Sequence, residues 1–224
     1  MYFIESPRLD AYFNMALEEY FFEKSDEFLI LWRNKNAVVV GKYQNTAEEI
    51  NAAQIRQAEV AVVRRLSGGG AMYQDTGNVN YTFIVNQSAA QADFSRFTST
   101  VTDALHALGV PAESRGRNDL VADGRKISGA AQFSKGTRTL HHGTLLFDSD
   151  LGAMQLALNT SPEKMESKGI KSIRNRVTNI RSYLPADMDV RCFMSFLSAH
   201  LTAAYGLSPY STTDSDISAV EKLA

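Results

Sequence analysis

The sequence has little of three things: cysteine, long apolar runs and net charge. Cys192 is the only cysteine among 224 residues, so an internal disulfide is excluded and a reducing compartment is the default expectation. The longest clean apolar runs, such as 37–40, are far shorter than a membrane span. Charged residues also interrupt the first ten positions, too early for the apolar segment of a signal peptide. We therefore expect a soluble, cytoplasmic protein that has no membrane partner.

The low net charge narrows the possible partners further. A formal charge of −2 argues against a general nucleic-acid binder, which is usually basic. No internal repeat, low-complexity block or Pro/Ser-rich linker divides the chain. Hydrophobic residues make up 44% of it, enough for a sizeable core. The sequence thus predicts one folded domain over residues 1–224.

Apolar periodicity separates the helices from the strands. Helical spacing predicts helices at 15–22, 94–108 and 193–205. Runs rich in β-branched and aromatic residues predict strands at 2–4, 28–32, 37–40, 60–63, 79–85 and 139–147. Helices are interspersed with hairpin-connected strands and do not alternate regularly with them. The pattern is therefore typical of an α+β domain and not of a doubly wound sheet.

Two local signals refine the helices. In the first helix, Glu18 and Glu19 are expected on the solvent-facing side. Thr46 followed by Glu49 fits a capping box, which predicts a helix that continues towards Gln57.

A run of three glycines, Gly68 to Gly70, follows a predicted strand and the pair Arg64-Arg65. Glycines let backbone N–H groups approach an anion, and the arginines add positive charge. In an extended segment adjacent side chains face opposite sides, so we expect one arginine to reach a ligand. The run is neither a Walker A motif nor a dinucleotide fingerprint, since no Gly-Lys-Ser/Thr follows it and Tyr73 stands where a third glycine is needed. A site for a bulky anion and a flexible turn with surface arginines both remain open.

The dipeptide Asp123-Gly124 is a strong signal for a two-residue β-hairpin turn. In the simple register Asp119 pairs with Ser128, and both share one sheet surface with Lys126. Small residues follow the lysine, which suits the floor of a pocket. There its ammonium can neutralise a carboxylate or phosphate, and the aspartate can hold Mg²⁺ or orient the lysine. An exposed edge hairpin with an ordinary Asp–Lys pair is the alternative.

The remaining polar candidates are less specific. His141 and His142 are adjacent, so we expect one to line a pocket and the other to be structural. No further His or Cys cluster has the spacing of a zinc site. A Ser-His-Asp hydrolase lacks its Gly-x-Ser-x-Gly element. Cys192 has apolar neighbours and is expected to be buried and unreactive.

The segment 164–181 is basic within an acidic chain. It is either a solvated loop or a lid over phosphates, or a dock for an acidic partner. Its cationic residues are Lys164, Lys168, Lys171, Arg174, Arg176 and Arg181.

Taken together, these stretches resemble the lipoate–protein ligase A family along nearly the whole chain. The order and spacing of several motifs make this resemblance more specific than any single glycine run. The matching segments are Phe13-Asn14-Met15-Ala16-Leu17-Glu18-Glu19, Leu31-Trp32-Arg33, Arg64-Arg65-x-Ser67-Gly68-Gly69-Gly70, Asp75-x-Gly77-Asn78, Gly116-Arg117-Asn118-Asp119-Leu120, Arg125-Lys126-x-Ser128-Gly129, His141-His142-Gly143-Thr144-Leu145, Lys168-Gly169-Ile170 and Arg176-Val177-Thr178-Asn179.

The resemblance implies a fold and an activity. The family fold, shared with biotin protein ligase catalytic domains, is a mixed, largely antiparallel β-sheet flanked by helices. The activity is ATP-dependent activation of lipoate to lipoyl-AMP, followed by transfer to a lysine of an apo lipoyl carrier domain. The implied partners are the lipoyl domains of 2-oxoacid dehydrogenase complexes and the glycine-cleavage H protein, with ATP and Mg²⁺ as cofactors and lipoate as substrate.

The resemblance also implies roles for individual residues. Lys126 is the implied catalytic residue and touches both the acyl carbonyl and the phosphate, and Asp119 is the implied Mg²⁺ ligand. The implied contacts with ATP or the adenylate are Arg65, Gly70, Ala71, Met72, Tyr73 and Lys126. The implied contacts with lipoate are Ser67, Gly69, Asn78, Lys126 and His142.

Larger members of the family carry a C-terminal accessory domain, which we expect to be absent from these 224 residues or to be supplied by a separate polypeptide. Transfer from a ready-made adenylate is therefore a more secure expectation than adenylate formation. Two alternatives remain. One is an octanoyl or lipoyl transferase that acts on a pre-activated donor, for which Cys192 is the only candidate thiol. The other is a non-catalytic protein that binds lipoate or lipoyl-AMP.

Overall fold

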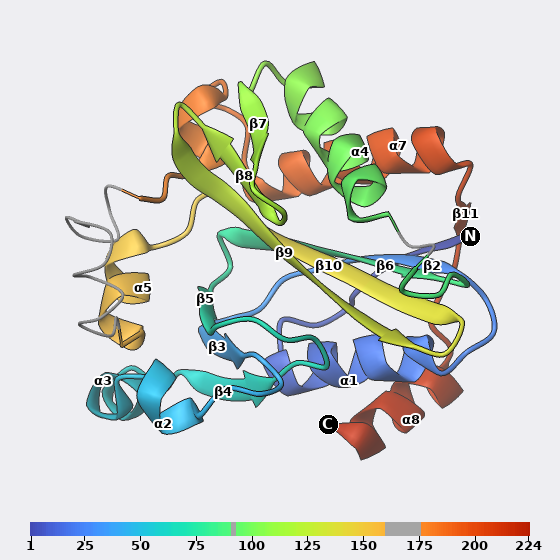
Figure 1. The fold of residues 1–224 in the computed structure, drawn as a ribbon, viewed down its shortest axis with the longest axis horizontal. Helices are drawn as coiled ribbons and strands as arrows, with labels where there is room; N and C mark the ends of the chain where they lie inside the picture. Colours follow the sequence, from blue (N-terminus) through green and yellow to red (C-terminus); the bar gives the residue numbers. More distant parts are fainter. Residues whose placement is uncertain (91–92, 160–175) are drawn as a thin grey trace.

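The computed structural model describes residues 1–90, 93–159 and 176–224. Its centre is an eight-stranded sheet beside which a smaller, three-stranded sheet lies (Figure 1). In spatial order the large sheet contains β11 (Ser208–Pro209), β1 (Tyr2–Glu5), β2 (Phe28–Trp32), β6 (Asn78–Val85), β10 (Arg138–Leu146), β9 (Arg125–Lys135), β8 (Asp119–Ala122) and β7 (Ala112–Arg115). The small sheet contains β4 (Ala61–Arg64), β3 (Ala37–Val40) and β5 (Met72–Gln74).

Most strand pairs of the large sheet are antiparallel. Only β11–β1 and β1–β2 are parallel in it, whereas every pair from β2 across to β7 is antiparallel. The predicted α+β class, with a mixed and largely antiparallel sheet, is therefore confirmed. The helices are α1 (Ala11–Phe22), α2 (Thr46–Glu49), α3 (Ala52–Gln57), α4 (Phe94–Ala107), α5 (Leu151–Ala157), the short 3-10 helix η2 (Ile180–Tyr183), α7 (Val190–Tyr205) and α8 (Asp214–Leu223).

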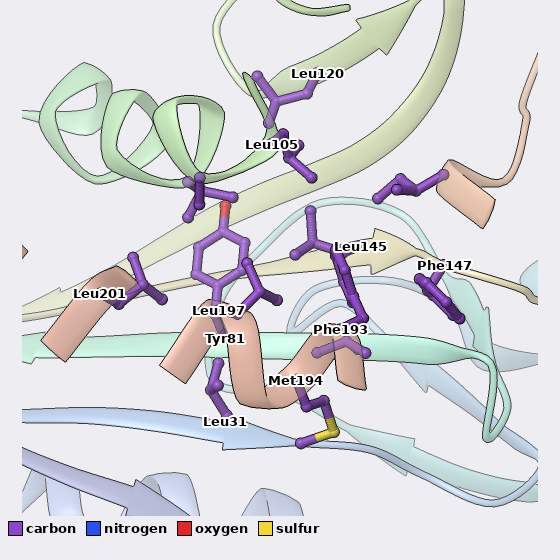
Figure 2. Close-up of a cluster of buried hydrophobic side chains, with 14 of the residues drawn as sticks. Leu31, Tyr81, Leu105, Leu120, Leu145, Phe147, Phe193, Met194, Leu197 and Leu201 are labelled. Carbon is purple, nitrogen blue, oxygen red and sulfur yellow. The ribbon is translucent and has the colours of Figure 1, made fainter. Parts of the chain in front are cut away.

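One face of the large sheet carries an apolar core under α4 and α7 (Figure 1). Inward-facing residues of β6, β8 and β10 alternate with residues of the other face, as the two-residue period of a strand requires. Figure 2 shows the meeting of side chains from β6, β8, β10, α4 and α7, among them Tyr81, Leu105, Leu120, Leu145, Phe193 and Leu197. This core fixes the sheet and leaves its opposite face for other groups.

α7 shows how an apolar stripe sets the orientation of a helix. Asp189 caps its N-terminus by accepting from the Cys192 backbone N–H at 2.8 Å, and Gly206 ends it in the left-handed region with φ 60°. Phe193 and Leu197 face the core. Cys192 lies beside this stripe in the first turn and is exposed, so the expectation of a buried cysteine is wrong: its apolar neighbours are in sequence, not in space.

The opposite face of the sheet is covered by α1, which packs against α8 (Figure 1). Asp10 caps α1 by accepting from the Phe13 N–H at 2.7 Å. The apolar core on this side covers only part of the strands. Polar side chains of β6 and β10 occupy the rest, beneath the small sheet.

The small sheet packs its outer side against α3 and α5. The predicted capping box that would open one long helix is wrong. Asn45 and Asn51 instead cap two short helices, since Asn45 accepts from Ala47 N and Asn51 from Gln54 N. Ile50 is extended between them and bridges to Leu158, which interrupts the helical path.

No helix in the described ranges has both the length and the apolar content to cross a bilayer.

Candidate active site

Two rows of side chains run across the polar face of the large sheet. Strand pairing places Trp32, Asn80, Thr144, Gly129 and Asp119 directly beside one another on five successive strands. A second row, two residues along each strand, contains Thr82, His142 and Ala131. Neighbouring strands are about 4.8 Å apart and alternate residues about 7 Å apart. Residues of these rows can therefore act on one ligand.

Lys126 and Asp119 form an ion pair over the first row. Lys126 Nζ lies 2.7 Å from Asp119 Oδ1, and both side chains are about 30% exposed (31% and 27%). A Cβ on Gly129 would lie 2.8 Å from Lys126 Nζ, so the ammonium packs closely against the backbone of Gly129. The predicted neighbourhood of Lys126 and Asp119 is confirmed.

The predicted register of this hairpin is wrong beyond its first two pairs. An irregularity between Leu120 and Val121 shifts the ladder, so Asp119 pairs with Gly129 and Leu120 with Ser128. Such a shift inserts one extra residue and turns the following side chains to the other face. Ser128 is therefore buried on the apolar side and does not share a surface with Lys126. The Asp123-Gly124 signal predicts the turn correctly, but no local sequence signal predicts the bulge at Leu120 and Val121.

The glycine loop is held in place by Arg65, which is only 6% exposed. Its guanidinium donates to the Gly68 and Gly70 carbonyl oxygens at 2.8 Å each and to the Val39 carbonyl at 3.2 Å. Burial lowers the pKa of Arg65, while Glu18 and Glu49 oppose that shift. The arginine is thus an internal organiser of the loop, which differs from the alternative of a flexible turn with surface arginines.

Arg64 is exposed and holds the neighbouring loop from the surface. It donates to the carbonyl oxygens of Gly41 and Gln44 at 2.8 and 2.9 Å. A Cβ on Gly41 would lie 1.8 Å from the Gly69 carbonyl oxygen, so Gly41 allows the two loops to touch. Gly69 itself has φ +97°, a conformation that favours glycine.

Gly70, like Gly68, has open space where a side chain would lie. A Cβ on Gly70 would meet nothing closer than Glu49 Oε2 at 3.8 Å, and Ala71 N donates to that same carboxylate oxygen at 3.1 Å. The free protein thus has room at Gly70, as expected if the missing side chain leaves space for a ligand.

A hydrogen-bonded chain joins the glycine loop to the sheet. Ser67 Oγ lies 2.7 Å from His142 Nε2, and His142 Nδ1 lies 2.9 Å from Glu18 Oε1. A carboxylate only accepts, so Nδ1 carries a proton and, in the neutral ring, Nε2 accepts from Ser67. Arg65 Nε in turn donates to Ser67 Oγ at 3.0 Å. The chain therefore connects the Glu18 carboxyl group to the Arg65 guanidinium through His142 and Ser67.

Glu18 is a residue of the polar face whose position the helical pattern predicts wrongly. It is 2% exposed and accepts from Thr82 Oγ1 at 2.5 Å as well as from His142. The expectation that it lies on the wet face of α1 is wrong, whereas Glu19 is exposed as predicted. Asn14, four residues earlier, is also buried, so a polar stripe at i and i+4 was a signal that the apolar residues concealed.

The two histidines lie on opposite faces of β10, as expected, while a pocket lined by one of them stays a prediction. His142 joins Ser67 and Glu18, whereas His141 lies in an aromatic environment on the other face of β10, within 5.1 Å of the Phe94 and Phe97 ring centroids. Burial, with a contribution from His142, lowers the pKa of His141 to about 3. His141 therefore stays neutral and structural.

Asn78 belongs to the polar face, at the start of β6, and its side chain is fully buried. The alternation Asn78, Asn80 and Thr82 puts three polar residues on one side of a central strand. This alternation is visible in the sequence and predicts a buried polar surface.

Met72 and Tyr73 diverge because β5 alternates. Met72 packs towards α1 and Val39, whereas Tyr73 packs with Val38 and Leu146 on the other side. The structure therefore does not bring the Tyr73 side chain together with Lys126 and Ser67. Its ring lines a separate cavity of about 400 Å³.

That cavity is acidic, with Asp75, Asp148 and Asp150 in its lining. Burial raises the pKa of Tyr73 to about 12, and the nearby Asp75 and Asp150 add to the shift. A collection of carboxylates does not suit a phosphate or carboxylate ligand.

Most of the predicted basic segment lies outside the described residues. Lys164, Lys168, Lys171 and Arg174, with the Lys168-Gly169-Ile170 motif, lie outside the described residues. Residues 176–178 add to the edge of the Lys126 strand, since Lys126 N donates to the Arg176 carbonyl and Thr178 N to the Lys126 carbonyl, at 2.8 and 2.9 Å. Arg181 donates to the carbonyls of Leu184 and Pro185 and is thus occupied structurally.

Residues 10–202 match the model of the lipoyl protein ligase A/B catalytic domain. This chain belongs to that family. The lipoate-protein ligase LplJ of Bacillus subtilis is 44% identical over 232 residues, which cover 100% of this chain and 70% of the relative. Lipoate-protein ligase 1 of Staphylococcus aureus is 39% identical over 96% of this chain and 67% of its own length.

The fold of the family agrees with solved structures. A bipartite lipoate protein ligase from Thermoplasma acidophilum superposes with a TM-score of 0.85, at 24% identity, over 99% of this chain and 91% of that chain. LipL1 of P. falciparum, solved in complex with lipoate, gives 0.77 at 27% identity, over 95% of this chain and 64% of that chain. The predicted family and fold are therefore confirmed.

Proposed function

We propose that this chain is an ATP-dependent lipoate–protein ligase. The observation that carries the proposal is the position of the Lys126 ammonium above Gly129, on the sheet face to which Ser67 and His142 anchor the glycine loop. That arrangement supports a single site that combines one cation with backbone N–H groups of the glycine loop. Membership of the lipoyl protein ligase family supplies the substrate class.

The reaction has two steps. A carboxylate oxygen of lipoate attacks the α-phosphorus of ATP, which forms a mixed anhydride and releases pyrophosphate. The neutral amine of a carrier lysine then attacks the acyl carbon, the C–O bond to phosphate breaks, AMP leaves, and the amine loses a proton. Both steps concentrate negative charge on acyl and phosphoryl oxygens, which fixed donors and cations stabilise.

We assign the stabilisation of this negative charge to Lys126. Its ammonium pairs with Asp119 at 2.7 Å and packs against Gly129, which has no side chain to block it. The ion pair keeps the lysine extended across the strand, where its charge can meet both the carboxylate and the α-phosphate. The glycine loop adds the backbone N–H groups of Gly69 and Gly70 for the same anion, whereas the Ala71 N–H already donates to Glu49.

We assign the Ser67–His142–Glu18 chain to the wall of the site beside the acyl group of the substrate. Its donors and acceptors satisfy one another, so none is left to attract a polar competitor. Trp32 closes this region by donating from Nε1 to Thr82 Oγ1 at 2.9 Å. An apolar acyl chain fits beside such an internally paired surface better than a charged one.

Mg²⁺ is part of the proposal, with Asp119 as its protein ligand. One partly exposed carboxylate suits a magnesium ion that is held mainly by phosphates and water, and no group of three His, Cys, Asp or Glu residues in the described ranges offers a complete metal site. When bound, the ion would neutralise phosphate charge.

The proposed acceptors are apo lipoyl domains, including those of 2-oxoacid dehydrogenases and the glycine-cleavage H protein. The Thermoplasma ligase was studied together with its E2 lipoyl domain, which supports this class of partner. An accessory domain or polypeptide is proposed to assist adenylate formation, as the Thermoplasma ligase is bipartite.

A thioester transferase is the less favoured alternative. Cys192 lies on α7, which packs on the apolar face of the sheet, whereas Lys126, Ser67 and His142 occupy the other face. A non-catalytic binding protein would keep the site and show no turnover.

The test is the intact mass of an apo lipoyl domain after incubation with this chain. One sample receives lipoate and Mg-ATP, and the other receives pre-formed lipoyl adenylate. We expect the mass of a lipoyl group to be added with the adenylate, and with Mg-ATP when the accessory polypeptide is supplied. A folded chain that modifies the domain in neither sample would favour the binding-protein alternative.

A further inference from the structure

Five buried carboxamides form a continuous chain from the surface to the polar face of the sheet. Asn14 Nδ2 donates to Asn34 Oδ1 at 2.8 Å, and Asn34 Nδ2 donates to Gln74 Oε1 at 2.8 Å. Gln74 Nε2 then donates to Asn80 Oδ1 at 2.9 Å. Asn78 Nδ2 donates to that same oxygen at 2.8 Å. All five residues are at most 2% exposed.

The direction of this chain is set at its outer end. Asn14 Nδ2 also donates to the backbone carbonyls of Arg8 and Arg33, at 3.2 and 2.9 Å, and the Ser6 hydroxyl lies 2.5 Å from Asn14 Oδ1. A backbone carbonyl only accepts, so the amide of Asn14 cannot be reversed. Each following amide must then point its oxygen outward and its nitrogen inward.

The inner end of the chain is not closed. In the part of the chain that the structure describes, Asn80 Nδ2 and Asn78 Oδ1 have no hydrogen-bond partner although both are buried. Buried polar groups are almost always paired, and each unpaired one destabilises the fold. One donor and one acceptor are thus held ready, two residues apart on one face of β6.

These two atoms belong to the site already described. Asn80 stands in the same cross-sheet row as Thr144, Gly129 and Asp119. The ammonium of Lys126 lies over Gly129. Asn80 and the Lys126 ammonium therefore lie along one row of the polar face, with Thr144 between Asn80 and Gly129.

We propose that Asn80 contacts the substrate and that Asn14, Asn34 and Gln74 are positioning residues that fix its amide. Asn80 Nδ2 donates to an oxygen of the acyl phosphate group, and Asn78 Oδ1 accepts from a ligand hydroxyl or amine. This inference rests on the proposed acyl-adenylate chemistry. It adds a second polar contact to the one from Lys126. It also assigns one role to the buried amides, which is to orient Asn80.

A reversal of the chain is the sharpest test, because it changes polarity with little change in shape. In Asn34→Asp the carboxylate has no donor, so Gln74 must rotate its amide to donate outward. Asn80 and then Asn78 must rotate as well, which presents an acceptor where the donor was. Gln74→Glu forces the same rotation from a closer position, and Asn80→Asp removes the donor itself.

The measurement is the affinity of each folded variant for the non-hydrolysable sulfamoyl analogue of lipoyl adenylate, by calorimetry. We expect Asn34→Asp, Gln74→Glu and Asn80→Asp to weaken binding by about 10- to 100-fold, the range expected for one hydrogen bond to a charged group. Ser6→Ala is the matched control, because Asn14 stays oriented by the two carbonyls, and we expect wild-type affinity.

A spectroscopic readout separates positioning from loss of folding. In wild-type protein labelled with ¹⁵N-asparagine, the side-chain NH₂ signal that Asn80→Asp removes should shift when the analogue binds. The proposal would be overturned if this signal does not shift. It would also be overturned if Asn34→Asp and Gln74→Glu bind the analogue as tightly as wild type. Wild-type protein that fails to bind the analogue would instead contradict the proposed function itself.

Discussion

The two faces of the large sheet are built from the same strands, but their buried side chains are stabilised by different interactions. On one face Tyr81 and Leu145 pack with α4 and α7 in a core without charge. On the other, Asn80, Thr82 and His142 are equally buried but bonded to other polar groups. The first face is stabilised by area removed from water, and the second by hydrogen bonds among its polar side chains, which leave Asn78 Oδ1 and Asn80 Nδ2 without a partner among the described residues. The difference teaches that burial alone does not distinguish core from site.

Removal of a large side chain from the apolar face should have the largest effect on stability. Phe193 is fully buried and stacks on Phe147 with ring centroids 4.7 Å apart. We expect Phe193→Ala to lower the free energy of unfolding by about 3–5 kcal/mol, with unchanged turnover per folded molecule. Urea denaturation checks this. Leu156→Ala, at an exposed position on α5, is the control and should change stability by less than about 0.5 kcal/mol.

Removal of the cation from the polar face should affect turnover and leave the fold intact. We expect Lys126→Ala to slow single-turnover transfer from lipoyl adenylate by about 10²- to 10³-fold, as for loss of one transition-state donor. Lys135→Ala is the matched control, since Lys135 lies on the same strand and pairs with Glu23 at 2.9 Å. Similar rates for the two variants would remove Lys126 from the mechanism.

Glu18 and Glu19 of α1 allow the effect on stability of a buried and an exposed glutamate to be compared directly. Glu18 accepts from Thr82 and His142, whereas Glu19 is exposed. We expect Glu18→Ala to destabilise the protein by about 2–3 kcal/mol, because two buried donors lose their acceptor. Glu19→Ala should leave the melting temperature nearly unchanged. Equal melting temperatures of the two variants would contradict the chain from Glu18 to Ser67.

The pairing of α1 with α8 should depend on pH through Asp216. Burial alone would raise its pKa, but hydrogen bonds from Tyr20, Thr213 and Tyr210 prevail and lower the pKa to about 2. A lowered folded pKa means that the carboxylate stabilises the fold above its ordinary pKa of 3.8 and loses this contribution as pH falls towards 2.

We therefore expect Asp216→Asn to be roughly 2 kcal/mol less stable than wild type at pH 7. The gap should narrow steadily below pH 4, where the wild-type carboxyl protonates. Urea denaturation at a series of pH values measures it. A constant gap from pH 7 to the acid limit would mean that the contribution of Asp216 is packing and not charge.

Substitution of the only cysteine should have the smallest effect. Cys192 is exposed on α7, on the far side of the sheet from Lys126. We expect Cys192→Ser to shift stability by less than about 0.5 kcal/mol and to transfer lipoyl groups at the wild-type rate. Loss of transfer in this variant would revive the thioester alternative.

Much of the apolar face follows from the sequence because its signals are local. Periodic apolar residues marked α4 and α7, and the Asp123-Gly124 turn marked the hairpin that carries Lys126. Errors arose where a long-range contact decided the outcome. The bulge beside Val121 shifts Ser128 to the core. Likewise, Glu18 is buried because Thr82 and His142 meet it.

The sequence by itself determined the α+β class, the glycine loop, the lysine hairpin and the family, because each depends on residue types at short spacings. Only the tertiary structure decided how the polar groups pair. It joins Glu18 to His142 across 124 positions, and Asn34 to Gln74 across 40. Hydrogen-bond partners far apart in sequence are chosen by the packing of whole strands and helices, and no local pattern records that choice.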